Sequence, residues 1–203
     1  MLANQSQSSQ PPAVPAHMQC SDEVVGGLIE TVSTALFSHF PKAAGDTFDV
    51  EVVMDALHVF RPKVPEIGML DGVLHIVHGR WDEAMHKLRE VIALAPEFDY
   101  AKAMLAYCLA SKGTEDWRQW AAESVANGAS RETRSLIRAL EAREDLLFAK
   151  MDYRGGEFVV PESCRALAEE TAAAEEKATA SAVASPTQRA AEVPEPQLGY
   201  LRA

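Results

Sequence analysis

The sequence is short of cysteine, of basic residues and of long apolar runs. Its three cysteines, Cys20, Cys108 and Cys164, lie far apart and form no CxxC pair, so neither a disulfide framework nor a thiolate zinc site is expected. The sequence contains nineteen basic and thirty acidic residues, and its formal net charge of −11 disfavours a nucleic-acid partner. No apolar run approaches the roughly 18 residues that a transmembrane helix needs. These absences predict a soluble, acidic protein with reduced thiols.

Composition divides the 203 residues into three parts. Residues 1–20 are rich in Gln, Ser, Pro and Ala, which predicts a disordered lead-in. Residues 161–203 are rich in Ala, Glu and Pro and offer few large apolar side chains to bury, so we expect a flexible tail with at most a frayed helix. We therefore predict that residues 21–160 form the folded domain.

Within residues 21–160, large apolar residues recur at steps of three and four, the period of an amphipathic helix. Proline, glycine and capping residues separate seven such runs. They cover about 22–41, 46–62, 65–79, 81–94, 100–111, 117–125 and 130–155. The short apolar run 158–160 has the composition of a strand but no partner strand. The pattern predicts an all-α fold of about seven helices.

Two of these helix pairs form an internal repeat of the tetratricopeptide type. That motif needs a glycine at the turn, small residues where the helices cross, and a proline after the second helix. Gly79 and Gly113 are 34 residues apart, which is the period of this repeat. The residues assigned to repeat packing are Gly72, Gly79, Ala84, Leu88, Pro96, Ala106 and Gly113.

The second repeat matches only in part, because Arg118 occupies its small position and Ala121 follows three residues later. A generic helical bundle, in which glycine and proline merely end helices, is the alternative interpretation. Under the repeat interpretation, the helices before Pro62 form a degenerate third pair and the seventh helix caps the array. The predicted fold is therefore a set of tetratricopeptide-like antiparallel helix pairs.

Arrays of helix pairs bind proteins in a concave groove lined by the first helix of each pair. The residues predicted to contact a partner there are Met69, His75, Lys102 and Tyr107. Three arginines at helical spacing, Arg131 to Arg138, are typical of a solvated helix face, with contact to an anionic lipid head group as the second interpretation.

Signatures of catalysis are missing from the sequence. His75, His78 and His86 come closest to a metal cluster, but no HExxH or comparable motif surrounds them. No glycine-rich phosphate loop and no GxSxG motif is present. We therefore expect no enzyme activity, no catalytic residues, no cofactor and no metal.

Several segments resemble the HrpB-one/HrpK family, small Hrp proteins of bacterial type III secretion in plant pathogens and their relatives. The resemblance is carried by the blocks 49–57 and 71–84, by the Arg61-Pro62-Lys63-Val64 corner, and by 101–106 with Trp117-Arg118. It extends over about residues 25–150. It implies a tetratricopeptide-like fold, a role in building or running the secretion apparatus during virulence, and no catalysis.

The leading hypothesis is a non-enzymatic secretion component that binds another type III secretion protein through its groove. A cytosolic chaperone for a secretion subunit and an envelope-associated structural protein stay open as alternatives, as does self-association. Residues 1–19 contain no lysine, arginine or apolar segment, so the sequence predicts no signal peptide and a cytoplasmic location. A periplasmic location, or secretion through the type III system, stays open.

Overall fold

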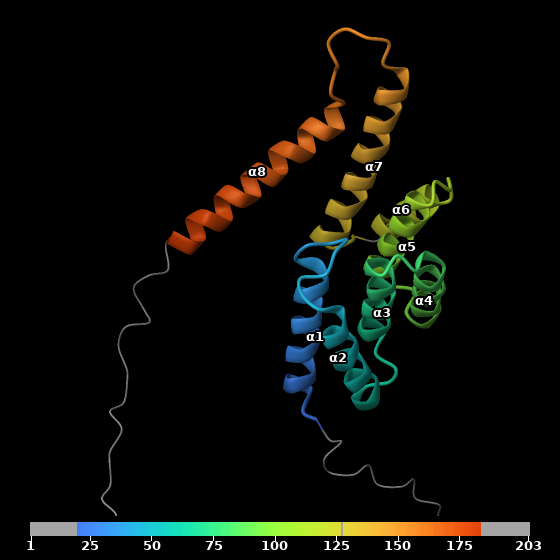
Figure 1. The fold of residues 1–203 in the computed structure, drawn as a ribbon, viewed down its shortest axis with the longest axis vertical. Helices are drawn as coiled ribbons and strands as arrows, with labels where there is room; N and C mark the ends of the chain where they lie inside the picture. Colours follow the sequence, from blue (N-terminus) through green and yellow to red (C-terminus); the bar gives the residue numbers. More distant parts are fainter. Residues whose placement is uncertain (1–19, 127, 184–203) are drawn as a thin grey trace, which may run out of the picture. The chain divides into compact units, whose positions relative to one another are not determined.

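The structure, a computed structural model, describes residues 20–126 and 128–183, with side chains up to residue 173. This part of the chain contains eight helices and no strand, so the prediction of an all-α fold is confirmed (Figure 1). The helices are α1 (Asp22–Phe37), α2 (Thr47–Phe60), α3 (Pro65–Val77), α4 (Trp81–Leu94), α5 (Asp99–Ser111), α6 (Trp117–Val125), α7 (Arg131–Asp152) and α8 (Glu162–Val183). The chain divides into two compact units between Ile137 and Arg138, inside α7.

The helices begin where local chemistry favours a helix start. The Ser21 hydroxyl accepts a hydrogen bond from the Val24 amide at 3.4 Å, and the Asp46 carboxylate accepts one from the Phe48 amide at 2.9 Å. Such side chains satisfy amide groups that have no partner within the helix. Local sequence also favours the starts of α3 and α7. Pro65 lies in the first turn of α3, and the Ser130 hydroxyl accepts a hydrogen bond from the Thr133 amide at 3.1 Å.

A close crossing between α3 and α4 forms the first repeat pair. Gly68 and Gly72 lie one turn apart on α3, and an added Cβ would come within 2.9 Å of Val91 and Leu88 of α4, respectively. Leu88 and Ala84 are fully buried at this crossing side of α4. Glycine therefore lets the two helices approach until α4 packs directly on the backbone of α3.

Helices α5 and α6 form the second pair, and α4 packs against α5. Gly79 (φ 71°) and Gly113 (φ 73°) make the two turns in the left-handed conformation that favours glycine. Ala106 is fully buried on α5, and Pro96 follows the last residues of α4. At the degenerate small position Arg118 is exposed, whereas Ala121 is buried, so α6 is rotated relative to the strict repeat.

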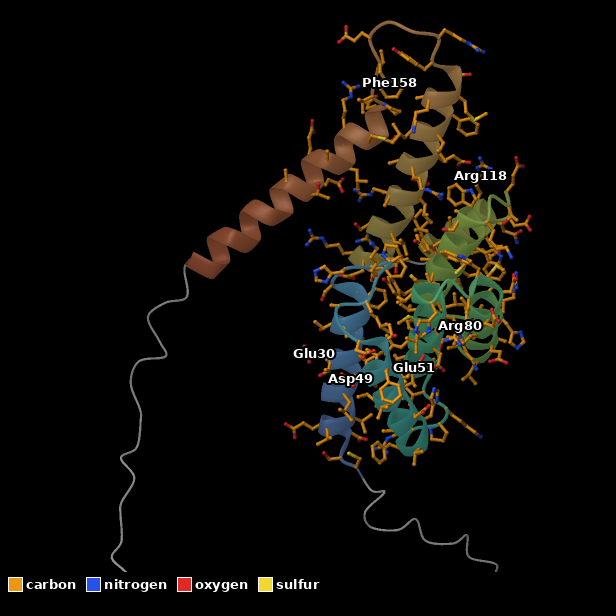
Figure 2. The ribbon with its side chains drawn as sticks, viewed as in Figure 1. Glu30, Asp49, Glu51, Arg80, Arg118 and Phe158 are labelled. Carbon is orange, nitrogen blue, oxygen red and sulfur yellow. The ribbon has the colours of Figure 1, made fainter. Side chains whose placement is uncertain are left out.

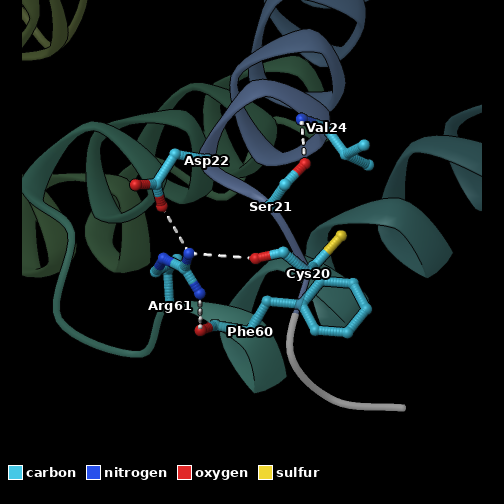
Figure 3. A network of polar contacts seen from close by, with 6 residues as sticks. All are labelled: Cys20, Ser21, Asp22, Val24, Phe60 and Arg61. Atoms are coloured by element: carbon cyan, nitrogen blue, oxygen red, sulfur yellow. Dashed lines mark hydrogen bonds and ion pairs between the residues drawn. The ribbon is translucent and has the colours of Figure 1, made fainter. Parts of the chain in front are cut away.

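The preceding helices α1 and α2 pack on each other and on α3. Arg61, which follows α2, links the end of α2 to the start of α1 (Figure 3). Its guanidinium donates to the Asp22 carboxylate at 2.5 Å and to the backbone oxygens of Cys20 at 3.1 Å and Phe60 at 3.0 Å. Arg61 of the Arg-Pro-Lys corner thus connects the two helices of the first pair.

In the C-terminal unit, α8 follows the second part of α7. Ser163 donates to the Asp145 carboxylate at 2.6 Å, the Cys164 thiol donates to the Ala142 carbonyl at 3.1 Å, and Arg138 pairs with Glu170. The structure thus has a helix where the sequence pattern indicates at most a frayed one. Alanine and glutamate favour helix intrinsically, and these contacts hold its first turns. The predicted lead-in, apart from residue 20, and the end of the tail beyond residue 183 lie outside the described residues.

The glycines provide a matched test of the α3–α4 crossing. Gly26 lies in α1 with no atom within 4 Å of an added Cβ, so Gly26→Ala should stabilise the protein by about 0.4–1 kcal/mol. Gly72→Ala should instead destabilise it by about 1–3 kcal/mol, because fully buried Leu88 has no room to move. Urea unfolding of both variants measures the difference, and equal stabilisation by the two substitutions would contradict this packing.

Truncation after residue 160 tests the proposed domain boundary. The hydrogen bonds and the ion pair from the first turns of α8 described above all end on α7. Because two of these three contacts are exposed and exposed ion pairs contribute only about 0–1 kcal/mol, a chain covering 21–160 should stay folded and keep its helical circular dichroism per residue. Aggregation or unfolding of this fragment would place the segment after residue 160 in the core.

Candidate functional site

The four residues predicted to line a groove do not share one open surface. Met69 and Lys102 are buried, with only 7% and 8% of their surfaces exposed, whereas His75 and Tyr107 are half-buried. The Lys102 ammonium donates to the Asp99 carboxylate on its own helix at 3.3 Å. Of the four residues, only His75 and Tyr107 therefore have appreciable surface to offer a partner in this conformation.

Tyr107 belongs to a row of five half-buried aromatic side chains, which we call the aromatic row. Its members are Phe37, Phe40, Trp81, Tyr100 and Tyr107. Phe37 of α1 meets the edge of Tyr100 at 5.9 Å between ring centroids, and Phe40 lies 5.1 Å from Tyr107. The ring centroid of Trp81, at the start of α4, lies 6.2 Å from that of Tyr107. The row joins the end of α1 to α4 and α5, and each such pair contributes about 0.5–1.5 kcal/mol beyond area burial.

The first helix pair explains why sequence reasoning missed this arrangement. The groove prediction treats the face of α5 that carries Tyr107 as open to a partner. In the structure the end of α1 and the following loop place two phenylalanines of the same chain against Tyr100 and Tyr107. The sequence signal was the seven-residue spacing of the tyrosines, which puts both on one face of a helix.

Histidines line the packing between α2 and α3. His58 of α2 lies 2.8 Å from an Asp71 carboxylate oxygen, and His78 lies 3.7 Å from Glu51 of α2. The Nδ1 atom of His75 is buried, and no group in the described part of the chain forms a hydrogen bond with it. Burial lowers the pKa of His75, and the charge of Arg80 lowers that pKa further. Both effects favour the neutral form of His75.

The remaining candidates for chemistry are buried or dispersed. Burial raises the pKa of Cys108 to about 12, so its thiol stays protonated at neutral pH. Among the residues that the structure describes, no group of three or more His, Cys, Asp or Glu side chains could hold a metal ion. No helix in residues 20–126 and 128–183 is long and apolar enough to cross a bilayer.

Comparison with known proteins identifies a family that this chain matches. A family model described as "Bacterial type III secretion protein (HrpB1_HrpK)" matches residues 15–146, more than half of the chain. The match covers helices α1 to α6 and most of α7, and it includes all members of the aromatic row. No curated protein and no solved structure matches the chain.

The lowered pKa of His75 predicts a specific acid sensitivity. The ordinary pKa of a histidine is 6.5, so His75 becomes protonated in the unfolded chain below pH 6.5. In the folded protein its pKa is lower, so protonation there requires a lower pH. The contribution of neutral His75 to stability is therefore complete above pH 6.5 and declines as the pH falls towards the lowered folded value. His75→Gln should accordingly lose less unfolding free energy than the parent between about pH 7.5 and about pH 5.

Urea unfolding at several pH values measures this difference in slope. His86→Gln is the matched control, because His86 is exposed on α4. If His75→Gln shows the same pH dependence as the parent, neutral His75 does not contribute to the acid sensitivity.

Proposed function

Because the chain belongs to the bacterial type III secretion protein family HrpB1_HrpK, we propose that it is a non-enzymatic component that binds another protein of the secretion apparatus through its helical repeat. The observation that supports this proposal best is the aromatic row. Its side chains come from α1, the loop after α1, α4 and α5, and each is only half-buried. Tyrosine and tryptophan in such positions are the residue types that dominate protein–protein contacts.

The aromatic row also changes the residues proposed for contact. Tyr107 is central, because it lies against both Phe40 and Trp81, and His75 is the second accessible candidate. Met69 and Lys102 would support the site from within, since both are buried. A partner would then contact the exposed edges of these rings and the apolar surface beside them. The interface would be smaller than one formed in a fully open groove.

Replacement of Tyr107 tests this proposal. Tyr107→Ala removes the ring that joins Phe40 to Trp81 and should reduce capture of secretion-system proteins by about tenfold or more, the size expected for a central aromatic contact. Tyr107→Phe keeps the ring and should keep capture. The measurement is a pull-down from cells with the secretion system induced, followed by mass spectrometry of the bound proteins.

The control is a double substitution on the outside of α4, His86→Ala with Glu90→Ala. Both side chains are exposed, the His86 Nε2 atom lies 3.2 Å from a Glu90 carboxylate oxygen, and neither residue belongs to the aromatic row. Thermal melts of each variant separate lost binding from lost folding. Capture that survives in folded Tyr107→Ala but disappears in the control pair would contradict the proposal, because the binding surface would then include the exposed side of α4 that carries His86 and Glu90.

Two alternatives to this proposal stay open, a cytosolic chaperone for a secretion subunit and an envelope-associated structural protein, and either would contribute to virulence through secretion. Fractionation of induced cells beside cytosolic and periplasmic markers separates them. The chaperone form predicts co-fractionation with the cytosolic marker, and the structural form predicts recovery with the envelope.

A further inference from the structure

Helix α2 presents an apolar stripe on the side opposite its core. Phe48, Val52 and Val59 are 65%, 52% and 58% exposed, and their spacing of four and seven residues places them on one face. The buried residues of α2 are Val50, Met54 and Leu57, about half a turn away around the helix. The helix is therefore apolar on two faces, of which only one is used within the described part of the chain. We call the other face the outer α2 face.

Acidic residues surround this stripe. Asp55 lies on the same face of the helix as the stripe, between Val52 and Val59 in the heptad spacing. Asp49 and Glu51 lie on either side of the stripe. Figure 2 shows the carboxylates of Asp49 and Glu51 on α2 and of Glu30 on α1. Glu51 also lies near His78, at 3.7 Å. The outer α2 face thus combines apolar contact area with negative charge.

The charge belongs to the whole first helix pair. Residues 22–60 contain seven carboxylates and a single lysine, Lys42, so they carry −6 of the formal net charge of −11. The carboxylates are Asp22, Glu23, Glu30, Asp46, Asp49, Glu51 and Asp55. Among the described residues, Arg61 pairs with Asp22, and the ring of His78 lies 3.7 Å from Glu51. No other lysine or arginine of the described residues forms an ion pair with these seven carboxylates. A partner of opposite sign would be both steered to this face and retained on it.

We propose that the outer α2 face docks a basic amphipathic helix of a partner protein. Apolar residues at heptad spacing would pack against Phe48, Val52 and Val59, as in other pairs of helices that meet along one seam. A lysine or arginine of the partner would face Asp55, and further basic residues would face Asp49 and Glu51. This surface is distinct from the aromatic row, and the inference stands or falls independently of the proposed function.

The same charges disfavour the other occupants. Anionic lipid surfaces and nucleic acids carry the same sign as the outer α2 face. Two copies of the chain meeting through this face would bring Asp49 and Asp55 of one copy near those of the other, which repels. A basic helix alone satisfies both the apolar stripe and the surrounding carboxylates.

Direct binding of a designed peptide to the full chain tests the inference. The probe is a fluorescent synthetic helix of about 18 residues with leucine at heptad positions and lysine elsewhere on the same side, measured by anisotropy at near-physiological salt. We expect saturable binding at a one-to-one ratio. A peptide with glutamate in place of lysine should bind at least about tenfold more weakly.

Paired substitutions distinguish docking from general attraction between opposite charges. Phe48→Ser with Val52→Ser leaves the charge unchanged and should weaken binding by at least about tenfold, whereas Leu94→Ser, which removes an equally exposed side chain from α4, should not. Asp55→Lys should weaken binding more than Glu97→Lys, which makes the same change of charge at an exposed position after α4.

Thermal melts test whether each variant is folded. If Phe48→Ser with Val52→Ser does not fold, Val59→Ser is used in its place. Equal weakening by both charge substitutions, with no effect of the serine variants, would overturn the inference, because binding would then be non-specific. A dimer of the parent that dissociates on Phe48→Ser with Val52→Ser would also overturn it, by identifying a second copy as the occupant. Peptide binding that persists in Tyr107→Ala would show that this surface works without the aromatic row.

Discussion

The close approach of α3 to α4 is the constraint on which the other features of the first unit depend. Two glycines of α3 face Val91 and Leu88 of α4 at distances that leave no space for a methyl group. This contact sets the position of α4, whose first residue, Trp81, contributes to the aromatic row. It also sets the position of α5, which packs on α4 and carries both tyrosines. A pair of residues without side chains thus positions the residues proposed to bind.

Most of the fold could be predicted because its signals are local. Helix starts follow from Ser21, Asp46 and Pro65, and the turns at Gly79 and Gly113 need a left-handed conformation that glycine adopts without strain. The repeat spacing located the crossing position at Gly72, but Gly68 was missed, since a glycine inside a helix has no local signature of its packing. The eighth helix was underestimated because its contacts through Ser163 and Cys164 are tertiary.

The candidate site was less predictable, for a physical reason. Helix α5 is apolar almost all round, and eight of its thirteen residues are buried. Periodicity identifies an outward face only when one side of a helix is polar, so it could not decide whether Lys102 or Tyr107 faces out. Nor could it show that Phe37 and Phe40 would meet Tyr100 and Tyr107, because that contact joins segments some sixty residues apart. Only the packing of the first helix pair determines these positions.

The first helix pair differs from an ordinary end of a repeat array in one informative way. Terminal repeats normally bury an apolar face against the array and turn a polar face to solvent, since no further repeat covers it. Helix α2 buries Val50, Met54 and Leu57 as expected, yet its outer face carries Phe48, Val52 and Val59. Exposed apolar side chains in such a row favour association, and the carboxylates beside them restrict association to partners of positive charge. The proposed docking of a basic helix would cover this row, which is why we expect the first helix pair to depart from the polar face of an ordinary terminal repeat.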